Sequence, residues 1–181
     1  MGKRIFDVVL SIIGLLLFGW IILLCCAIAA IDTGSNGIFR QVRIGRYGKS
    51  FTIFKLRTMH LKSGFISGTG QFFRKKKLDE LPQLWNVLTG DMSFVGSRPD
   101  VPGYYDALQG EDRRVLKLRP GITGPASLKY FNEEEILESV PDAQRYNDEV
   151  IFPDKVKINL QYEKEKSVWL DLKIIFLTLA R

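Results

Sequence analysis

The stretch LDELPQLWNVL, residues 78–88, constrains the fold most strongly. Its apolar residues recur at helical spacing, and Gly90 follows as a stop signal. Proline is tolerated only in the first turn of a helix, because it lacks an N–H and its ring clashes with the preceding turn. Pro82 therefore places Asp79 and Glu80 at the N-terminus of the predicted helix. The apolar positions are Leu81, Leu84, Trp85 and Leu88.

The adjacent carboxylates of Asp79 and Glu80 allow two interpretations. Acidic side chains are favourable at a helix N-terminus, and the basic residues 74–77 just before them offer ion-pair partners. A carboxylate pair can also hold Mg²⁺, which prefers oxygen ligands and shares them with phosphate groups. One carboxylate can attack phosphorus to form an acyl phosphate. The residue pattern alone leaves both interpretations open.

Charge is distributed unevenly on the two sides of this stretch. Residues 1–78 hold thirteen Lys or Arg and only two acidic residues, whereas residues 79–181 hold thirteen basic and eighteen acidic residues. A basic region next to an apolar segment is typical of proteins that bind anionic lipid or phosphate-bearing ligands. We see no nucleic-acid-binding motif and expect no nucleic-acid partner.

The apolar segment, residues 8–31, contains no charged residue. As a helix it would be about 36 Å long, enough to cross the hydrocarbon core of a membrane. A single spanning helix fits this hydropathy. A cleaved signal peptide is a second interpretation, although the apolar run exceeds the usual signal core.

Charge at the two ends of this segment favours a third arrangement. Lys3 and Arg4 precede it and four basic residues follow within 40–49, and positive residues prefer the cytoplasmic side. A helix that enters the membrane, bends and returns places both ends on that side. Gly14 and Gly19 are weak points for such a bend, but no proline is present, so the sequence leaves the bend open.

The remaining elements are predicted more coarsely. Strands are expected at residues 37–43 and 50–58, joined by a turn at 45–48, and loops at 61–70 and 91–99. Helices are expected at 104–117, 133–139 and 154–164. The apolar tail, residues 169–179, either lies in the membrane interface or packs on the core.

Few other residues offer catalytic chemistry. His60 is the single histidine, and no Ser-His-Asp or Cys-His motif surrounds it. Cys25 and Cys26 are neighbours inside the apolar segment, so neither a disulfide framework nor a zinc site is expected.

Several motifs together resemble the bacterial sugar transferase family, the small monotopic phosphoglycosyl transferases that begin glycan assembly on polyprenol phosphate. The similarity is carried by LDELPQLWNVL at 78–88, GDMSFVG at 90–96 and Arg98-Pro99. Shorter matches are FRQ at 39–41, IFK at 53–55, RTM at 57–59, RPGITG at 119–124 and WLDLK at 169–173. The similarity extends in order from about Arg4 to the C-terminus.

The resemblance implies a mixed α/β, mostly helical fold with a re-entrant N-terminal membrane helix and a small β-hairpin. A helical catalytic core and a C-terminal amphipathic interfacial helix complete it. The membrane helix would comprise residues 1–36, and the catalytic domain on the cytoplasmic face of the bacterial inner membrane would comprise residues 37–181.

The resemblance also implies an enzyme that moves a sugar 1-phosphate from a UDP-sugar to polyprenol (undecaprenyl) phosphate and releases UMP. Asp79 would be the nucleophile and Glu80 its partner, and the pair would bind Mg²⁺. Basic residues would contact the phosphates. These are Lys55, Arg74, Arg98 and, in a turn with a structural or substrate-binding role, Arg119.

Some positions depart from the family pattern. Gly19-Trp20 stands where Ser-Pro usually breaks the helix, and Ser97 replaces a proline. Pro125-Ala126-Ser127 replaces a commoner continuation, which leaves the sugar preference open. The alternative function is a non-catalytic, membrane-anchored basic module that binds anionic lipid or a partner protein.

Overall fold

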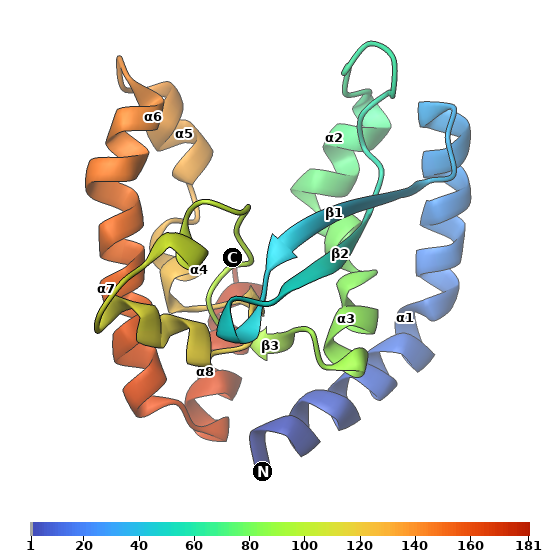
Figure 1. Cartoon of the computed structure of the whole chain (residues 1–181). Helices are drawn as coiled ribbons and strands as arrows, with labels where there is room; N and C mark the ends of the chain where they lie inside the picture. Colours follow the sequence, from blue (N-terminus) through green and yellow to red (C-terminus); the bar gives the residue numbers. More distant parts are fainter. Residues whose placement is uncertain (1) are drawn as a thin grey trace. The chain divides into compact units, whose positions relative to one another are not determined.

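The computed structural model describes residues 2–181, which form two compact units. Of these residues, the first unit comprises 2–43 and 50–92, and the second comprises 44–49 and 93–181. The structure is mostly helical with two small sheets, in agreement with the expected fold class (Figure 1). The predicted boundary between a membrane helix and a catalytic domain at residue 36 stays a prediction.

The first unit contains the N-terminal helix, a two-stranded hairpin and the helices that flank the carboxylate pair. Both predicted strands are confirmed. The helix expected after Pro82 is also confirmed, and it ends at Gly90, whose positive φ closes it. The elements are α1 (Gly2–Thr33), β1 (Ile38–Ile44), β2 (Ser50–Leu56), α2 (Gly68–Lys75), a 3₁₀ turn (Leu78–Glu80) and α3 (Gln83–Thr89).

Helix α2 begins inside the loop that was expected to reach residue 70. The Ser67 hydroxyl caps the helix by accepting from the Gly70 N–H at 3.0 Å. The sequence does not predict this part of the helix, because its first turn contains two glycines and glycine disfavours helix interiors. The loop prediction is therefore wrong for residues 68–70.

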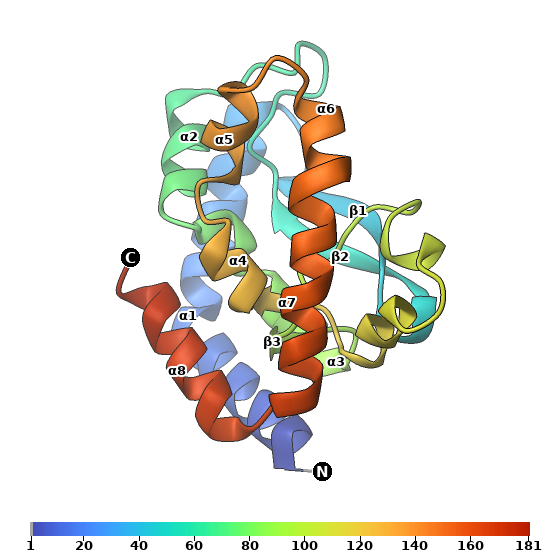
Figure 2. The ribbon, with the colours of Figure 1, turned by 90° about the vertical axis from the view of Figure 1, so that its left-hand side faces the viewer.

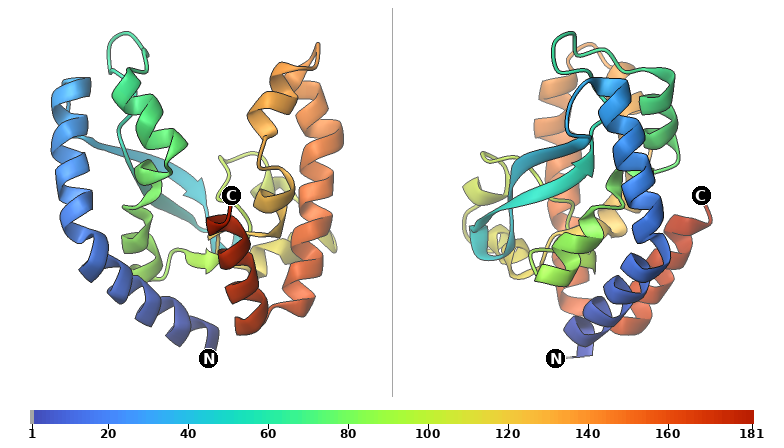
Figure 3. Two further views of the ribbon diagram at one scale, coloured as in Figure 1. Left: turned by 180° about the vertical axis from the view of Figure 1, so that it is seen from behind. Right: turned by 90° about the vertical axis from the view of Figure 1, so that its right-hand side faces the viewer.

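Helix α1 is continuous over 32 residues but bends in its middle, as Figures 1 and 3 show. Its first half packs on α3, where a Cβ at Gly14 would lie 3.2 Å from Leu84 Cδ1. The buried Ser11 hydroxyl donates back to the Val8 carbonyl at 2.9 Å, a contact that favours helix bending. Gly19 has open space around it.

The core of the first unit joins the second half of α1 to the hairpin and to α2. Its buried apolar members are Cys25, Ala29, Leu56 and Phe73. The opposite face of α1 is exposed, with Leu16 at 78% and Leu23 at 73% of full exposure. By length and composition α1 is the one helix among residues 2–181 that is able to cross a membrane.

The second unit is built on a helical frame around a small parallel sheet, and α4 packs against both the long helix α7 and α8 (Figure 2). Ser93 pairs with Gly121 and Val95 with Thr123 in the sheet. The strands are β3 (Ser93–Val95) and β4 (Gly121–Thr123). The helices are α4 (Pro125–Lys129), α5 (Glu133–Glu138), α6 (Ala143–Tyr146), α7 (Phe152–Glu165) and α8 (Val168–Leu179), with a π-turn at Asn147–Ile151.

Two predictions for the second unit need correction. The helix expected at 104–117 is two 3₁₀ segments, Tyr105–Ala107 and Asp112–Lys117, because Gly110 between them has a φ of +55° and cannot continue a helix. The loop expected at 91–99 contains β3, a strand of three residues that is too short to show alternation. The helices expected at 133–139 and 154–164 are confirmed as α5 and α7.

The motifs GDMSFVG at 90–96 and RPGITG at 119–124 meet through direct backbone contact at their glycines. A Cβ at Gly96 would lie 2.1 Å from the Arg119 carbonyl, and one at Gly124 would lie 2.0 Å from the Gly96 carbonyl. Gly121 donates to the Ser97 carbonyl at 2.7 Å. No side chain fits at these positions, which explains why glycine occupies them in GDMSFVG and RPGITG.

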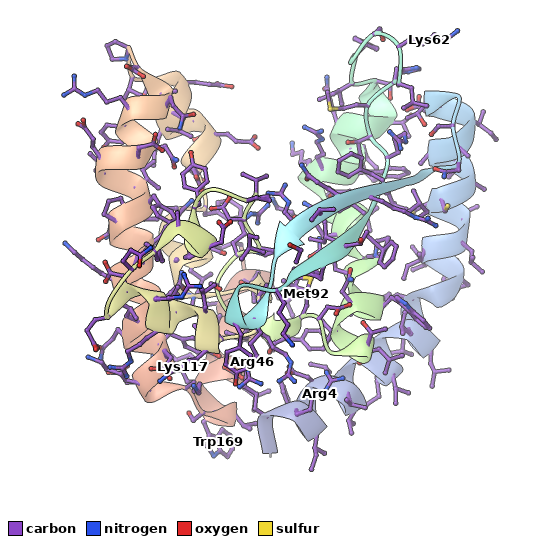
Figure 4. All side chains as sticks on the ribbon, viewed as in Figure 1. Arg4, Arg46, Lys62, Met92, Lys117 and Trp169 are labelled. Atoms are coloured by element: carbon purple, nitrogen blue, oxygen red, sulfur yellow. The ribbon has the colours of Figure 1, made fainter. Side chains whose placement is uncertain are left out.

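Helix α8 turns a carboxylate inward and apolar side chains outward. Asp171 is fully buried and accepts a hydrogen bond from the Tyr162 hydroxyl, while Ile174 joins the core. Trp169, labelled in Figure 4, is 82% exposed and Phe176 is 69% exposed. The helix therefore packs on the core along one face and presents an apolar face to its surroundings.

Candidate active site

The Asp79-Glu80 pair lies in the first unit, on the 3₁₀ turn that leads into α3. Lys77 precedes the turn with a φ of +54° and ψ of +20°, a left-handed conformation that is uncommon for a residue with a side chain. Asp79 is 9% exposed, and its buried Oδ1 atom has no hydrogen-bond partner. Such strain and such an orphaned oxygen are concentrated at functional sites in proteins.

Strand β2 brings Lys55 to this pair. The Lys55 Nζ atom lies 3.1 Å from Glu80 Oε1, and both side chains are largely buried. Glu80 is thus held in place and its charge is partly balanced, whereas Asp79 lies beside it with one oxygen free of partners. The phosphate contact that the resemblance implies for Lys55 stays a prediction; in the structure its side chain pairs with Glu80.

Arg74 is oriented by a threonine from the segment after β2. Its Nε–H donates to Thr58 Oγ1 at 2.9 Å, and Thr58 is 6% exposed. Arg74 occupies the last turn of α2, five residues before Asp79 in the chain. The structure therefore gathers four predicted site residues, Lys55, Arg74, Asp79 and Glu80, within one unit.

The electrostatic surroundings of Asp79 act in opposite directions. Burial raises the pKa of its carboxyl above the ordinary range, and the neighbouring Glu80 charge raises it further. Lys55, Lys77 and Arg74 lower this pKa but do not offset the burial. A carboxylate with a raised pKa is more basic and a better nucleophile than a free one once it is ionised.

Asn86 is a buried polar residue beside the candidate site, and sequence reasoning did not single it out. Fully buried on α3, it donates from Nδ2 to the Thr52 carbonyl at 2.8 Å and accepts from the Phe54 N–H at 3.1 Å. These are the bonds that a neighbouring strand would make to β2, so the Asn86 amide fixes α3 against the strand that carries Lys55. The apolar spacing of 78–88 predicts that Trp85 faces the core. In the structure Trp85 is exposed and the polar Gln83 is buried, so the spacing did not indicate that Asn86 is buried.

The carboxylate pair suits Mg²⁺. Residues 2–181 contain no group of three or more His, Cys, Asp or Glu side chains placed to hold a metal. Mg²⁺ needs only one or two carboxylates, because it keeps water and substrate phosphate oxygens as further ligands. The unpartnered Asp79 Oδ1 is a hard oxygen donor of this kind, so Asp79 and Glu80 fit the ion.

Arg98 and Arg119 belong to the second unit. Arg98 is exposed in the loop after β3, and the Arg119 carbonyl lies against Gly96. Their predicted contact with the donor phosphates stays a prediction.

Comparison with known proteins adds an independent finding. The family model described as bacterial sugar transferase matches residues 1–181. The UDP-glucose:undecaprenyl-phosphate glucose-1-phosphate transferase of Escherichia coli (strain K12) is 36% identical over 198 residues, which cover 99% of this chain and 39% of that protein. The galactosyl transferase CpsE of Streptococcus agalactiae serotype III (strain NEM316) is 34% identical over 98% of this chain and 41% of its own length.

The chain spans about two fifths of the length of these two relatives. It covers 86% of a third, the sugar transferase EpsL of Bacillus subtilis (strain 168), at 34% identity. Since the family model matches the whole chain, the protein belongs to the bacterial sugar transferase family.

Proposed function

We propose that the chain transfers a sugar 1-phosphate from a UDP-sugar to polyprenol phosphate and releases UMP. The observation that carries the proposal is the Asp79 carboxylate, which is buried among cations with one oxygen unpartnered. The names of relatives support it, because the Escherichia coli protein is named for glucose-1-phosphate transfer to undecaprenyl phosphate.

The reaction would proceed in two half-reactions. Asp79 attacks the β-phosphorus of the donor, a new O–P bond forms, and the bond to the bridging oxygen breaks so that UMP leaves with that oxygen. A phosphate oxygen of the polyprenol phosphate then attacks the same phosphorus and frees the Asp79 carboxylate. Glu80 and Lys55 hold one another beside the reacting carboxylate, and Arg74 supplies positive charge for the donor phosphates. Mg²⁺ bound by Asp79 and Glu80 would offset the charge of the diphosphate.

We further propose that α1 enters the membrane and returns to the cytoplasmic face of the inner membrane. Near its start, Arg4 donates to the Val87 carbonyl at 2.6 Å and to the Leu88 carbonyl at 2.8 Å (Figure 4 labels Arg4). Near its end, Asp32 accepts from the Ser67 hydroxyl at 2.6 Å. Both ends thus bond to elements of the same unit, which favours a helix with both ends on one side of the membrane.

The test is UMP release by the detergent-purified protein given a panel of UDP-sugars, Mg²⁺ and undecaprenyl phosphate. We expect release by the wild type, no release by Asp79→Asn, and loss of release when EDTA removes the metal. A folded wild type that releases no UMP from any donor, yet binds anionic vesicles, would support the non-catalytic membrane module instead.

A further inference from the structure

We propose that Thr58 is a positioning residue, whose hydroxyl holds the Arg74 guanidinium in the orientation that binds the phosphates of the nucleotide-sugar donor beside Asp79. The inference rests on the proposed function, in which Arg74 contacts the donor diphosphate. It assigns a role to the threonine of the RTM motif at 57–59, which the proposed chemistry otherwise leaves unused.

The contact between the two side chains restricts the orientation of the guanidinium. Arg74 uses its Nε–H for the 2.9 Å bond to Thr58 Oγ1, and both terminal nitrogens stay outside that bond. The guanidinium is planar and rigid, so holding Nε–H restricts the directions in which the remaining N–H groups can point. An arginine held in this way loses less side-chain entropy when it binds a phosphate through two parallel hydrogen bonds.

The backbone of Thr58 also fixes the rotation of α2. A Cβ at Gly70 would lie 2.4 Å from the Thr58 carbonyl oxygen, so the helix backbone packs directly on residue 58. Gly70 and Arg74 are four residues apart and share one face of α2. Thr58 therefore meets this face twice, through its carbonyl at Gly70 and through its hydroxyl at Arg74.

The start of α2 is fixed along its axis as well. Ser67 accepts from the Gly70 N–H at 3.0 Å and donates to Asp32 at the end of α1. The helix that carries Arg74 is thus anchored at its first turn and in its rotation. Helix α2 also packs against the 3₁₀ turn that carries Asp79, so the same fold holds the Arg74 side chain near the proposed nucleophile.

Steady-state kinetics of the full-length protein with UDP-sugar and undecaprenyl phosphate test the inference. Thr58→Val keeps the side-chain shape and removes the acceptor, and we expect it to raise the donor KM about tenfold with a smaller change in kcat. Thr58→Ser restores the hydroxyl and should stay within about twofold of the wild type. Ser50→Ala, which removes a hydroxyl at an exposed position at the start of β2, is the control and should leave the donor KM unchanged.

A double-mutant cycle separates positioning from a merely structural role. In an Arg74→Ala background, Thr58→Val should cause no further rise in donor KM, because the group that it orients is already absent. Two results would overturn the inference: equal losses from Thr58→Val in both backgrounds, or a Thr58→Ser variant as impaired as Thr58→Val.

The inference can fail separately from the proposed function. If the wild type releases no UMP from any donor, the proposed function fails, and the same variants are compared by calorimetric titration with UDP. UDP binding that is about tenfold weaker in Thr58→Val than in Thr58→Ser still supports the positioning role. Equal UDP affinities in the two variants would contradict it.

Discussion

At the scale of single residues, the Asp79 carboxylate combines burial with an unpartnered oxygen, and both are unfavourable for the fold. An isolated buried carboxylate costs free energy because the protein replaces water that would solvate its charge. Lys55, Lys77 and Arg74 reduce this cost without removing it, since the pKa of Asp79 stays raised. If Asp79 is the nucleophile, as proposed, its placement trades stability for reactivity, which is common in active sites.

Replacing Asp79 by Asn should raise the stability of the fold while abolishing transfer. A raised native pKa means that the ionised form destabilises the fold, so the wild type loses stability as the pH rises through the unfolded-state pKa towards the native pKa. Thermal unfolding in detergent should show the variant more stable by about 1 kcal/mol at neutral pH. The advantage should shrink as the pH falls towards 4, and an advantage that grows on acidification would contradict the sign of this pKa shift.

At the scale of elements, Asn86 joins α3 to β2 and so controls the position of Lys55 relative to Glu80. Asn86→Ala leaves the Thr52 carbonyl and the Phe54 N–H without these partners. We expect a loss of about 3 kcal/mol in the free energy of unfolding. Asn132→Ala, at an exposed position before α5 with no side-chain capping bond, should change it by less than about 0.5 kcal/mol. Similar losses in both variants would remove the special role of Asn86.

The contact between the two glycine motifs gives a second prediction at this scale. Gly96→Ala places a Cβ 2.1 Å from the Arg119 carbonyl oxygen, a backbone atom that cannot move away freely. The variant should lose more than about 3 kcal/mol of stability or fail to fold. Gly19→Ala, which adds a methyl group into open space on α1, should be neutral or stabilising. Chemical denaturation of the two variants, followed by circular dichroism, makes the comparison.

Sequence patterns predicted elements well where one physical signal dominates. Pro82 and Gly90 marked the limits of α3, and alternation with turn residues predicted the hairpin. Patterns failed where tertiary contact decides the structure. Glycine-rich α2 is a helix because Ser67 caps it and Gly70 packs on Thr58, and three-residue β3 exists because β4 pairs with it.

In the candidate site, too, some residues were predictable from the sequence and others depend on tertiary contact. Asp79, Glu80, Lys55 and Arg74 were predicted from the carboxylate pair and the family resemblance, and they lie in one unit. Thr58 and Asn86 were not predicted, because a buried hydroxyl or amide acquires its role only from the backbone and side chains that fold around it. The resemblance implies the reacting groups, and the structure shows which buried side chains bond to the elements that carry them.

At the scale of the whole molecule, two helices expose apolar surfaces that a membrane would cover. Leu16, Trp20 and Leu23 of α1 are each more than half exposed, as are Trp169 and Phe176 of α8. Exposed apolar area of this kind marks interaction sites in soluble and membrane proteins alike. Since one proposed substrate is a lipid and the other is water-soluble, an enzyme at the membrane surface can bind both.

The proposed return of α1 to one side of the membrane is testable by chemical labelling. In a variant that lacks Cys25 and Cys26, single cysteines are introduced by Gly2→Cys and, in a separate protein, by Asn36→Cys. Both should react with a membrane-impermeant maleimide in inverted inner-membrane vesicles and stay protected in intact spheroplasts. Reaction of the two cysteines from opposite sides would show that α1 spans the membrane.

The central claim is that Asp79 takes the sugar phosphate covalently, and intact-protein mass spectrometry after a single turnover tests it most directly. The protein is mixed with its UDP-sugar and Mg²⁺ in the absence of polyprenol phosphate. We expect one equivalent of UMP per protein, a mass increase of one sugar phosphate on Asp79, and its loss when polyprenol phosphate is added. UMP release that requires both substrates together with no mass increase, or labelling that persists in Asp79→Asn, would contradict the account.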